Sequence, residues 1–298
     1  MRRTLKARVL SVALVATVVV GLHAVLLAQQ HDTAATKSRL QDRVFQSESL
    51  ARPMKYRIHL PKDYFETNRS YPALYLLHGW HGDYQNWSRL TKLAHYAEGL
   101  PLIVIMPDAG DSWYVDSATS TQDKFEQYVI HDLIEEVDQH WRTVRSSHRR
   151  AIAGLSMGGY GAVKFALKYP DMFQVAASIS GAFNAASPEL ERSRSDLQPS
   201  LVKAFGEAHS KTREQNDLFA LAASARRPQS TAYIYIDCGN QDSSFLEPNR
   251  SFVSLLSQRN FAYEYHEYPG AHSWQYWDER LPEVLRVVQQ QIVEAISW

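Results

Sequence analysis

A serine in a glycine-rich turn is the residue of this chain best placed for nucleophilic chemistry. Residues 154–158 read Gly-Leu-Ser-Met-Gly, with Ser156 at the centre. The apolar run 151–153 before it predicts a strand, and residues 160–167 after it predict a helix. On such a sharp turn the serine hydroxyl is held clear of the sheet, and the helix N-terminus points free N–H groups toward it. A chance match in a tight turn is the alternative, and the flanking strand and helix argue against it.

A serine hydroxyl is a weak nucleophile near neutral pH and needs a base, which is usually a histidine held by a carboxylate. Three histidines follow Ser156, namely His209, His266 and His272. His209 lies in a polar stretch, and His266 falls inside a predicted strand. His272 comes directly after that strand, at the edge of the sheet where Ser156 should also emerge. We therefore expect His272 to be the base, with a histidine in a surface turn as the alternative.

The carboxylate partner of that histidine should lie in a loop at the same edge. The predicted strand 232–236 runs into Asp237, and Asp242 sits in the loop beyond, before a predicted helix. We favour Asp242, because Asp237 still belongs to the strand end and could bond backbone N–H groups of the turn. Asp237 and Glu247 remain the alternatives.

A negative charge that develops on an attacked carbonyl oxygen needs fixed backbone donors. We expect these to be the N–H groups of Met157, directly after the serine, and of Trp80, in the loop that follows the apolar strand 73–77. His78 and His81 could instead be a metal pair, but no cluster of carboxylates or cysteines joins them. We therefore expect neither a metal nor another cofactor.

The elements that must position these groups alternate between strands and helices. Predicted strands cover residues 44–50, 54–60, 73–77, 102–106, 173–179, 232–236 and 263–268. Helical spacing of apolar residues marks 125–141 and 281–296. This alternation predicts an α/β fold with a mostly parallel central sheet and helices on both faces. The polar segment 182–230 interrupts it, and we interpret it as a lid-like excursion or pocket wall rather than a solvated surface insertion.

The N-terminal segment predicts export. Residues 1–8 are basic, and residues 9–28 are almost wholly apolar, long enough to cross a bilayer. Residues 1–28 are therefore interpreted as a signal peptide or an uncleaved membrane anchor, 29–43 as a linker and 44–298 as the catalytic domain. The product would be periplasmic or secreted, or anchored to the outer face of the membrane. Without the four basic residues of the leader the chain is slightly acidic, which gives no case for a nucleic-acid partner.

Four motifs, in order, resemble those of one known family. They are Leu76-Leu77-His78-Gly79, Gly154-Leu155-Ser156-Met157-Gly158-Gly159, Asp237-Cys238-Gly239 with Asp242, and Pro269-Gly270-Ala271-His272-Ser273-Trp274. From about residue 44 to the end, the chain resembles the esterase D-type family of α/β-hydrolases. That family includes feruloyl and short-acyl esterases, S-formylglutathione hydrolases and antigen 85 mycolyltransferases.

The resemblance implies roles for individual residues. Ser156, Asp242 and His272 would form the catalytic triad. Trp80 and Met157 would form the oxyanion hole. Residues 108–114, with Trp113 and Tyr114, resemble a pocket loop of the secreted esterases in that family.

The expected function is an exported serine carboxylic-ester hydrolase that works through an acyl-enzyme on a small-molecule or carbohydrate-linked ester. The bulky Trp80, Trp113 and Tyr114 predict short-acyl or aromatic substrates. An acyltransferase of the antigen 85 type and an S-formylglutathione hydrolase-like thioesterase are the alternatives, although the leader argues against the second, since those enzymes are typically cytosolic. A catalytically inactive binding module is disfavoured by the intact set of Ser156, Asp242 and His272.

Overall fold

The computed structural model describes residues 38–294, and within them eight strands form one sheet in the order β1-β2-β4-β3-β5-β6-β7-β8. The strands are β1 (Leu40–Ser47), β2 (Arg52–His59), β3 (Ala73–Leu77), β4 (Ile103–Pro107), β5 (Arg150–Leu155), β6 (Val175–Ile179), β7 (Tyr233–Gly239) and β8 (Tyr263–Tyr268). β2 runs antiparallel to both β1 and β4, and all other neighbouring pairs are parallel. The carboxyl ends of six parallel strands therefore meet at one edge.

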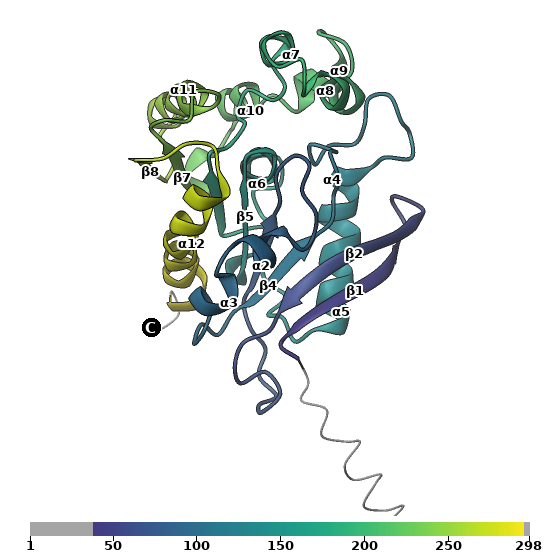
Figure 1. The fold of residues 1–298 in the computed structure, drawn as a ribbon, viewed down its shortest axis with the longest axis vertical. Helices are drawn as coiled ribbons and strands as arrows, with labels where there is room; N and C mark the ends of the chain where they lie inside the picture. Colours follow the sequence, from purple (N-terminus) through teal and green to yellow (C-terminus); the bar gives the residue numbers. More distant parts are fainter. Residues whose placement is uncertain (1–37, 295–298) are drawn as a thin grey trace, which may run out of the picture. The chain divides into compact units, whose positions relative to one another are not determined.

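The α-helices outside the segment 182–230 follow the parallel strands and cover the sheet. They are α2 (Asn86–Leu90), α3 (Leu93–Tyr96), α4 (Phe125–Gln127), α5 (Ile134–His140), α6 (Met157–Lys168), α11 (Leu246–Gln258) and α12 (Trp274–Val288). π-helical turns at Tyr128–Leu133 and Gln289–Glu294 connect α4 to α5 and extend α12. Figure 1 shows α12 on one side of the sheet and α5 on the other.

The core alternates along each central strand because successive side chains point to opposite faces. On β3, Leu74 and Leu76 join a cluster that includes Leu281 of α12. Tyr75 and Leu77 join the larger cluster on the opposite face, with α5, α6 and α11. Helices thus bury both faces, and the predicted α/β architecture is confirmed.

Strand β1 begins at Leu40, inside the range that the sequence assigns to a linker. It pairs antiparallel with β2 along its whole length. Asp42, Arg43 and Val44 are exposed there, and Asp42 forms an ion pair with Arg57 across the hairpin. The polar composition of 40–43 therefore belongs to an edge strand with little to bury, which hydrophobic periodicity does not detect.

The segment 182–230 forms a layer of short helices above the carboxyl edge of the sheet, at the top of Figure 1. These helices are α7 (Pro188–Ser193), α8 (Gln198–Phe205), α9 (Lys211–Gln215) and α10 (Leu218–Ser224). Leu201, Phe205 and Leu218 are fully buried in the main core. The buried Arg213 donates to the carbonyl of Ala186 at 3.1 Å and to that of Gly206 at 2.8 Å. These contacts describe a packed wall rather than a solvated insertion.

The predicted leader or anchor at residues 1–28 and most of the predicted linker lie outside the described residues. Among residues 38–294, no helix is both long enough and apolar enough to cross a membrane.

Candidate active site

The turn between β5 and α6 holds Ser156 in a strained conformation, with φ 52° and ψ −118°. A Cβ on Gly154 would lie 2.4 Å from the carbonyl carbon of Gly158, and one on Gly158 would lie 2.5 Å from the carbonyl oxygen of Leu77. Any side chain at either position would collide with backbone. The two glycines therefore let the strand, the turn and the helix pack closely enough to present the serine at the sheet edge.

Ser156, His272 and Asp242 form a continuous hydrogen-bonded chain. The Ser156 Oγ lies 3.0 Å from His272 Nε2, and His272 Nδ1 lies 2.7 Å from Asp242 Oδ2. Because an ionised carboxylate only accepts hydrogen bonds, Nδ1 carries the imidazole proton and Nε2 is free to accept one from the serine. Asp242 is 1 % exposed, and its Oδ1 accepts from the N–H groups of Ser244 and Phe245 at 3.2 and 3.1 Å. The carboxylate is thus fixed on both oxygens.

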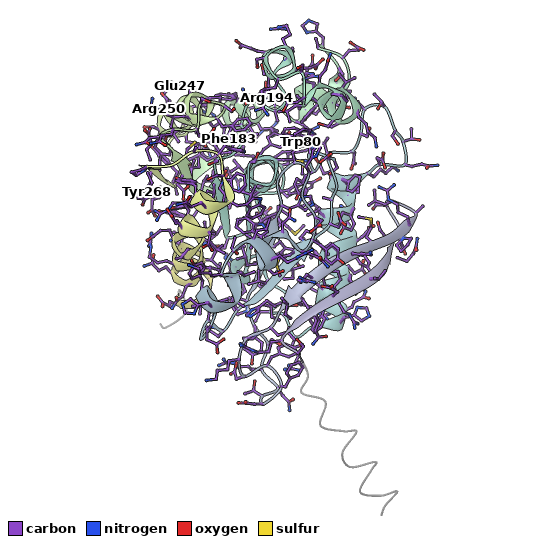
Figure 2. All side chains as sticks on the ribbon, in the orientation of Figure 1. Trp80, Phe183, Arg194, Glu247, Arg250 and Tyr268 are labelled. Carbon is purple, nitrogen blue, oxygen red and sulfur yellow. The ribbon has the colours of Figure 1, made fainter. Side chains whose placement is uncertain are left out.

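The alternative acids lie elsewhere. Asp237 is fully buried inside β7, where its carboxylate accepts from the hydroxyls of Tyr235 at 2.9 Å and Tyr276 at 3.0 Å. Its partners are therefore tyrosine hydroxyls and not the turn N–H groups expected from the sequence. Burial raises the pKa of Asp237 to about 7, although both tyrosine hydrogen bonds oppose this shift. Glu247, on α11, pairs with Arg250 at 2.5 Å, and Figure 2 places both at the side of the molecule.

The alternative histidines have other partners or none near the serine. His266 lies within β8, and its Nε2 is 2.6 Å from Glu264 Oε1. His209 is exposed in the loop between α8 and α9. Neither joins the chain of hydrogen bonds at Ser156.

The loop after β3 lies directly against the nucleophile turn. A Cβ on Gly79 would be 3.4 Å from the Ser156 Cβ. The N–H of Gly82 closes a turn on the carbonyl of Gly79 at 3.0 Å, and His81 at its third position has φ 59°. Among the backbone hydrogen bonds outside the helices and strands of residues 38–294, none uses the N–H of Trp80 or of Met157, the first residue of α6, as donor. Both N–H groups therefore remain free to bind an oxygen atom.

His78 holds this loop in place and is not a metal ligand. Its Nδ1 donates to the carbonyl of Gly79 at 2.7 Å, and its Nε2 accepts from the N–H of Ala109 at 3.0 Å. Burial lowers the pKa of His78, which keeps the ring neutral in this bonding pattern. Both ring nitrogens are occupied, so neither can join His81 at a metal. Within the described part of the chain, no three histidine, cysteine or acidic residues gather in a cluster that could hold a metal ion.

A cavity of about 310 Å³ opens at Ser156 and His272. Its aromatic walls are Trp80, Trp113, Phe245, Trp274 and Trp277. Trp113, predicted as a pocket residue, is held there by a hydrogen bond from its indole Nε1 to Ser200 Oγ at 3.0 Å.

Tyr114, the other residue predicted to line the pocket, lies beneath the cavity and not in its wall. It is completely buried, and its hydroxyl donates to the carbonyl of His78 at 2.9 Å. Its ring covers Gly161 of α6, where a Cβ would lie 2.8 Å from the ring. Its carbonyl accepts a hydrogen bond from the buried Lys164. Trp113 and Tyr114 both have φ 55°, and this backbone turns one ring toward the cavity and the other into the core.

Several wall residues were not predicted from the sequence. Trp274 and Trp277 follow His272 at the start of α12, so their closeness to the proposed base was a usable signal. Phe245 similarly follows Asp242. Arg194, from the segment after α7, carried no signal, because nothing in a polar excursion shows which side chain faces the site.

A serine on a strand–turn–helix, with an acid and a histidine after later strands of a mostly parallel sheet, defines an α/β-hydrolase. The model of the Esterase family, described as "Putative esterase", matches residues 47–288. The chain therefore belongs to this family, and the predicted resemblance and the assignment to the carboxylic-ester hydrolases are confirmed.

Relatives in other organisms agree with this assignment. The chain is 28 % identical over 212 residues to the acetyl esterase of Caldicellulosiruptor saccharolyticus, which covers 70 % of this chain and 79 % of that protein. It is 29 % identical over 253 residues to the esterase Rv1288 of Mycobacterium tuberculosis, covering 76 % of this chain and 54 % of that protein. The chain thus spans about half the length of the second relative.

Solved structures share the fold. FphF, a fluorophosphonate-binding serine hydrolase of Staphylococcus aureus, superposes with a TM-score of 0.75 at 27 % identity, covering 84 % of this chain and 97 % of that one. An S-formylglutathione hydrolase from the same organism gives a TM-score of 0.71 at 26 % identity, covering 84 % of this chain and 98 % of that one.

An acyltransferase is also among the sequence relatives. The mycolyltransferase Ag85B of Mycobacterium leprae is 25 % identical over 251 residues, covering 70 % of this chain and 73 % of that protein.

Proposed function

We propose that this protein is an exported serine esterase that cleaves short-acyl or aromatic carboxylic esters through an acyl-enzyme. The observation that carries the proposal is the hydrogen-bonded chain from Ser156 Oγ through His272 to the buried Asp242. It gives the serine a base, and it gives the base a fixed tautomer.

The geometry supports a two-stage mechanism. His272 Nε2 takes the Ser156 proton while Oγ attacks the ester carbonyl. The N–H groups of Trp80 and Met157 stabilise the tetrahedral oxyanion, and His272 returns the proton to the leaving alcohol. Water, deprotonated by the same nitrogen, then attacks the acyl-enzyme, and His272 returns that proton to Ser156 Oγ as the acid leaves. Asp242 stays ionised and stabilises the imidazolium that forms in each stage.

The cavity supports small substrates. Its volume is about 310 Å³, and its lining includes four tryptophans and one phenylalanine. These rings favour short acyl chains or flat aromatic acids, since both fit between large rigid side chains. The packed wall 182–230 limits how far a long chain could extend.

Two related functions differ in the second substrate or in the leaving group. An acyltransferase would pass the acyl group from Ser156 to an alcohol, and a mycolyltransferase is among the relatives. A thioesterase would release a thiol, and an S-formylglutathione hydrolase is among the similar solved structures. Adding an alcohol acceptor and a matched thioester to one assay separates these functions by product.

Export rests on the sequence of residues 1–28 alone. In a bacterial host, the full-length chain should be found outside the cytoplasm. Deleting residues 1–28 should leave active enzyme in the cytosol. An active cytosolic pool of the full-length chain would contradict export.

The acyl-enzyme is tested by rapid-mixing kinetics with a 4-nitrophenyl ester. Wild type should release a burst of about one equivalent of nitrophenol before the steady state. Ser156→Ala should show no burst, and Ser243→Ala, at an exposed serine of the Asp242 loop, should behave as wild type. Turnover without a burst in wild type would argue against acyl-enzyme accumulation, and turnover by Ser156→Ala would remove the serine from the mechanism.

A further inference from the structure

The residues that line the cavity include one fixed charge, on Arg194. This arginine follows α7, in the wall of short helices, and Figure 2 shows it above Trp80. No aspartate or glutamate is among the cavity-lining residues of the described chain. Asp242 does not line the cavity, and its Oδ2 is hydrogen-bonded to His272. The cavity lining therefore carries one positive charge, whose ion-pair partner Asp196 is not among the lining residues.

The guanidinium of Arg194 is held in a defined plane and keeps free donors. Its Nε and Nη2 bond the two carboxylate oxygens of Asp196 at 2.9 and 2.7 Å, and its Nη1 donates to Ser244 Oγ at 3.2 Å. A guanidinium has five N–H donors. These three bonds leave two N–H groups, one on each terminal nitrogen, that can donate to a further anion.

The ion pair with Asp196 does not prevent a second anion from binding. The side chains of Arg194 and Asp196 are 34 % and 49 % exposed, and exposed pairs of this kind contribute little net free energy. The carboxylate of Asp196 instead fixes the orientation of the guanidinium. The hydrogen bonds to Asp196 also raise the pKa of Arg194, so the positive charge persists at any working pH.

Ser244 connects the guanidinium to the loop that holds the triad acid. The Oγ of Ser244 accepts from Arg194, and its N–H donates to Asp242 Oδ1 at 3.2 Å. A substrate group held by Arg194 is therefore close to the loop that supplies the triad acid. Arg194 and Ser156 line the same cavity, so an anion bound to Arg194 would share that cavity with the ester.

We propose that Arg194 binds a negatively charged group of the substrate, and that the natural ester carries a carboxylate or similar anion beside the scissile bond. This inference rests on the proposed function at Ser156. It predicts the charge of the substrate, in addition to the small size and aromatic character that the cavity favours.

The test compares two acyl groups of the same shape. The 4-nitrophenyl monoester of glutaric acid carries a carboxylate, and the 4-nitrophenyl ester of 5-methylhexanoic acid has an isopropyl group in its place. Wild type should have the higher kcat/KM for the anionic ester. Arg194→Gln should lower the ratio of the two kcat/KM values about 10- to 100-fold, mainly through KM, because a charge-assisted hydrogen bond is lost. Turnover of the neutral ester should stay within a few-fold.

Arg192→Gln is the matched control. It removes the same charge two residues away, in α7, but Arg192 is exposed and does not line the cavity. If Arg192→Gln lowered the ratio of the two kcat/KM values equally, the preference for the anionic ester would come from the overall electrostatic field of the protein. That result would overturn the role of Arg194. An unchanged ratio in Arg194→Gln would exclude an anion on the acyl side of the ester.

A second pair of esters locates the anion. The acetate of 4-hydroxybenzoic acid carries the charge on the alcohol side, and the acetate of 4-hydroxybenzamide is its neutral analogue. Dependence on Arg194 in either pair supports the proposal and says which side of the ester carries the charge. Independence in both pairs, with normal neutral turnover, refutes the inference and leaves the esterase intact.

Binding separates this inference from the proposed function. Calorimetry on Ser156→Ala measures, without turnover, the affinity for the anionic ester whose turnover depends on Arg194. Adding Arg194→Gln to that variant should weaken binding about 10-fold or more, even if the reaction were not the one proposed. Equal affinity in the two proteins would contradict the inference.

Discussion

The hydroxyl of Tyr276 donates to the carboxylate of Asp237 at 3.0 Å, and this bond ties the first turn of α12 to the end of β7. His272 lies just before α12, and Asp242 lies just after β7. A second hydroxyl, from Tyr235, bonds the same carboxylate. The bond between Tyr276 and Asp237 therefore fixes the spacing of β7 and α12, the elements next to the acid and the base, without contacting either catalytic residue.

The buried Asp237 should make stability depend on pH. Burial raises its pKa to about 7, against an ordinary value of 3.8. A carboxyl whose folded-state pKa is raised favours the folded protein while protonated, so its contribution is largest below about pH 4 and is lost as the pH rises through about 7. The loss is about 4 kcal/mol at most. The free energy of unfolding of wild type, minus that of Asp237→Asn, should fall between pH 4 and 8. Parallel curves for the two proteins would contradict it, and Glu247→Gln serves as the exposed control.

The triad acid should be Asp242 and not its neighbours. Asp242→Asn keeps the shape but stabilises the wrong imidazole tautomer, which costs about 10⁴ in kcat in serine hydrolases. Asp237→Asn and Glu247→Gln should keep kcat within a few-fold, because neither carboxylate reaches His272. The measurement is kcat and thermal midpoint for all three variants in one buffer. Loss of turnover in Asp237→Asn at an unchanged midpoint, with Asp242→Asn active, would reverse the assignment.

Lys164 should contribute strongly to the free energy of unfolding. Its Nζ is completely buried, pairs with Glu126 at 2.7 Å and donates to the carbonyl of Tyr114. Burial lowers the pKa of Lys164 to about 8, although Glu126 opposes the shift. Lys164→Met should destabilise the protein by about 3–5 kcal/mol, because it leaves a buried carboxylate short of a partner. Lys168→Met, at the more exposed partner of Glu126, should cost less. Urea midpoints compare the two, and equal losses would count against this ranking.

Acyl length should be limited by the tryptophan walls. Esters of acetate, butyrate and ferulate should turn over faster than a C16 ester, since Trp80 and Trp113 leave no long apolar channel in a cavity of about 310 Å³. The measurement is kcat/KM across an acyl series with one leaving group. Faster turnover of the C16 ester would show that the wall 182–230 opens.

Much of the fold could be predicted because the central strands are continuous apolar runs that end in motifs. Leu74 to Leu77 leads into His78-Gly79, and Ala151 to Ala153 leads into the serine turn. Parallel topology then places the loops at one edge, which brings the distant residues Ser156, Asp242 and His272 together.

Other features depend on tertiary contacts that leave no local pattern. β1 has polar residues because only one side of an edge strand is covered. Tyr114 was expected in the pocket beside Trp113, but two consecutive residues with positive φ send the rings in different directions. Arg194 lines the cavity from a segment that Arg213 holds through Glu191 and that the buried Leu190 and Leu197 flank, which spacing along the chain does not reveal.

Labelling by a fluorophosphonate probe tests the central role of Ser156 most directly. The probe forms a covalent bond only with a serine that a base activates, so wild type should be labelled at one site, in the peptide that contains Ser156. Ser156→Ala should lose the label together with a factor on the order of 10⁴ to 10⁶ in kcat, with KM little changed. Labelling that survives in Ser156→Ala, or that maps to another serine in wild type, would contradict the assignment of the nucleophile.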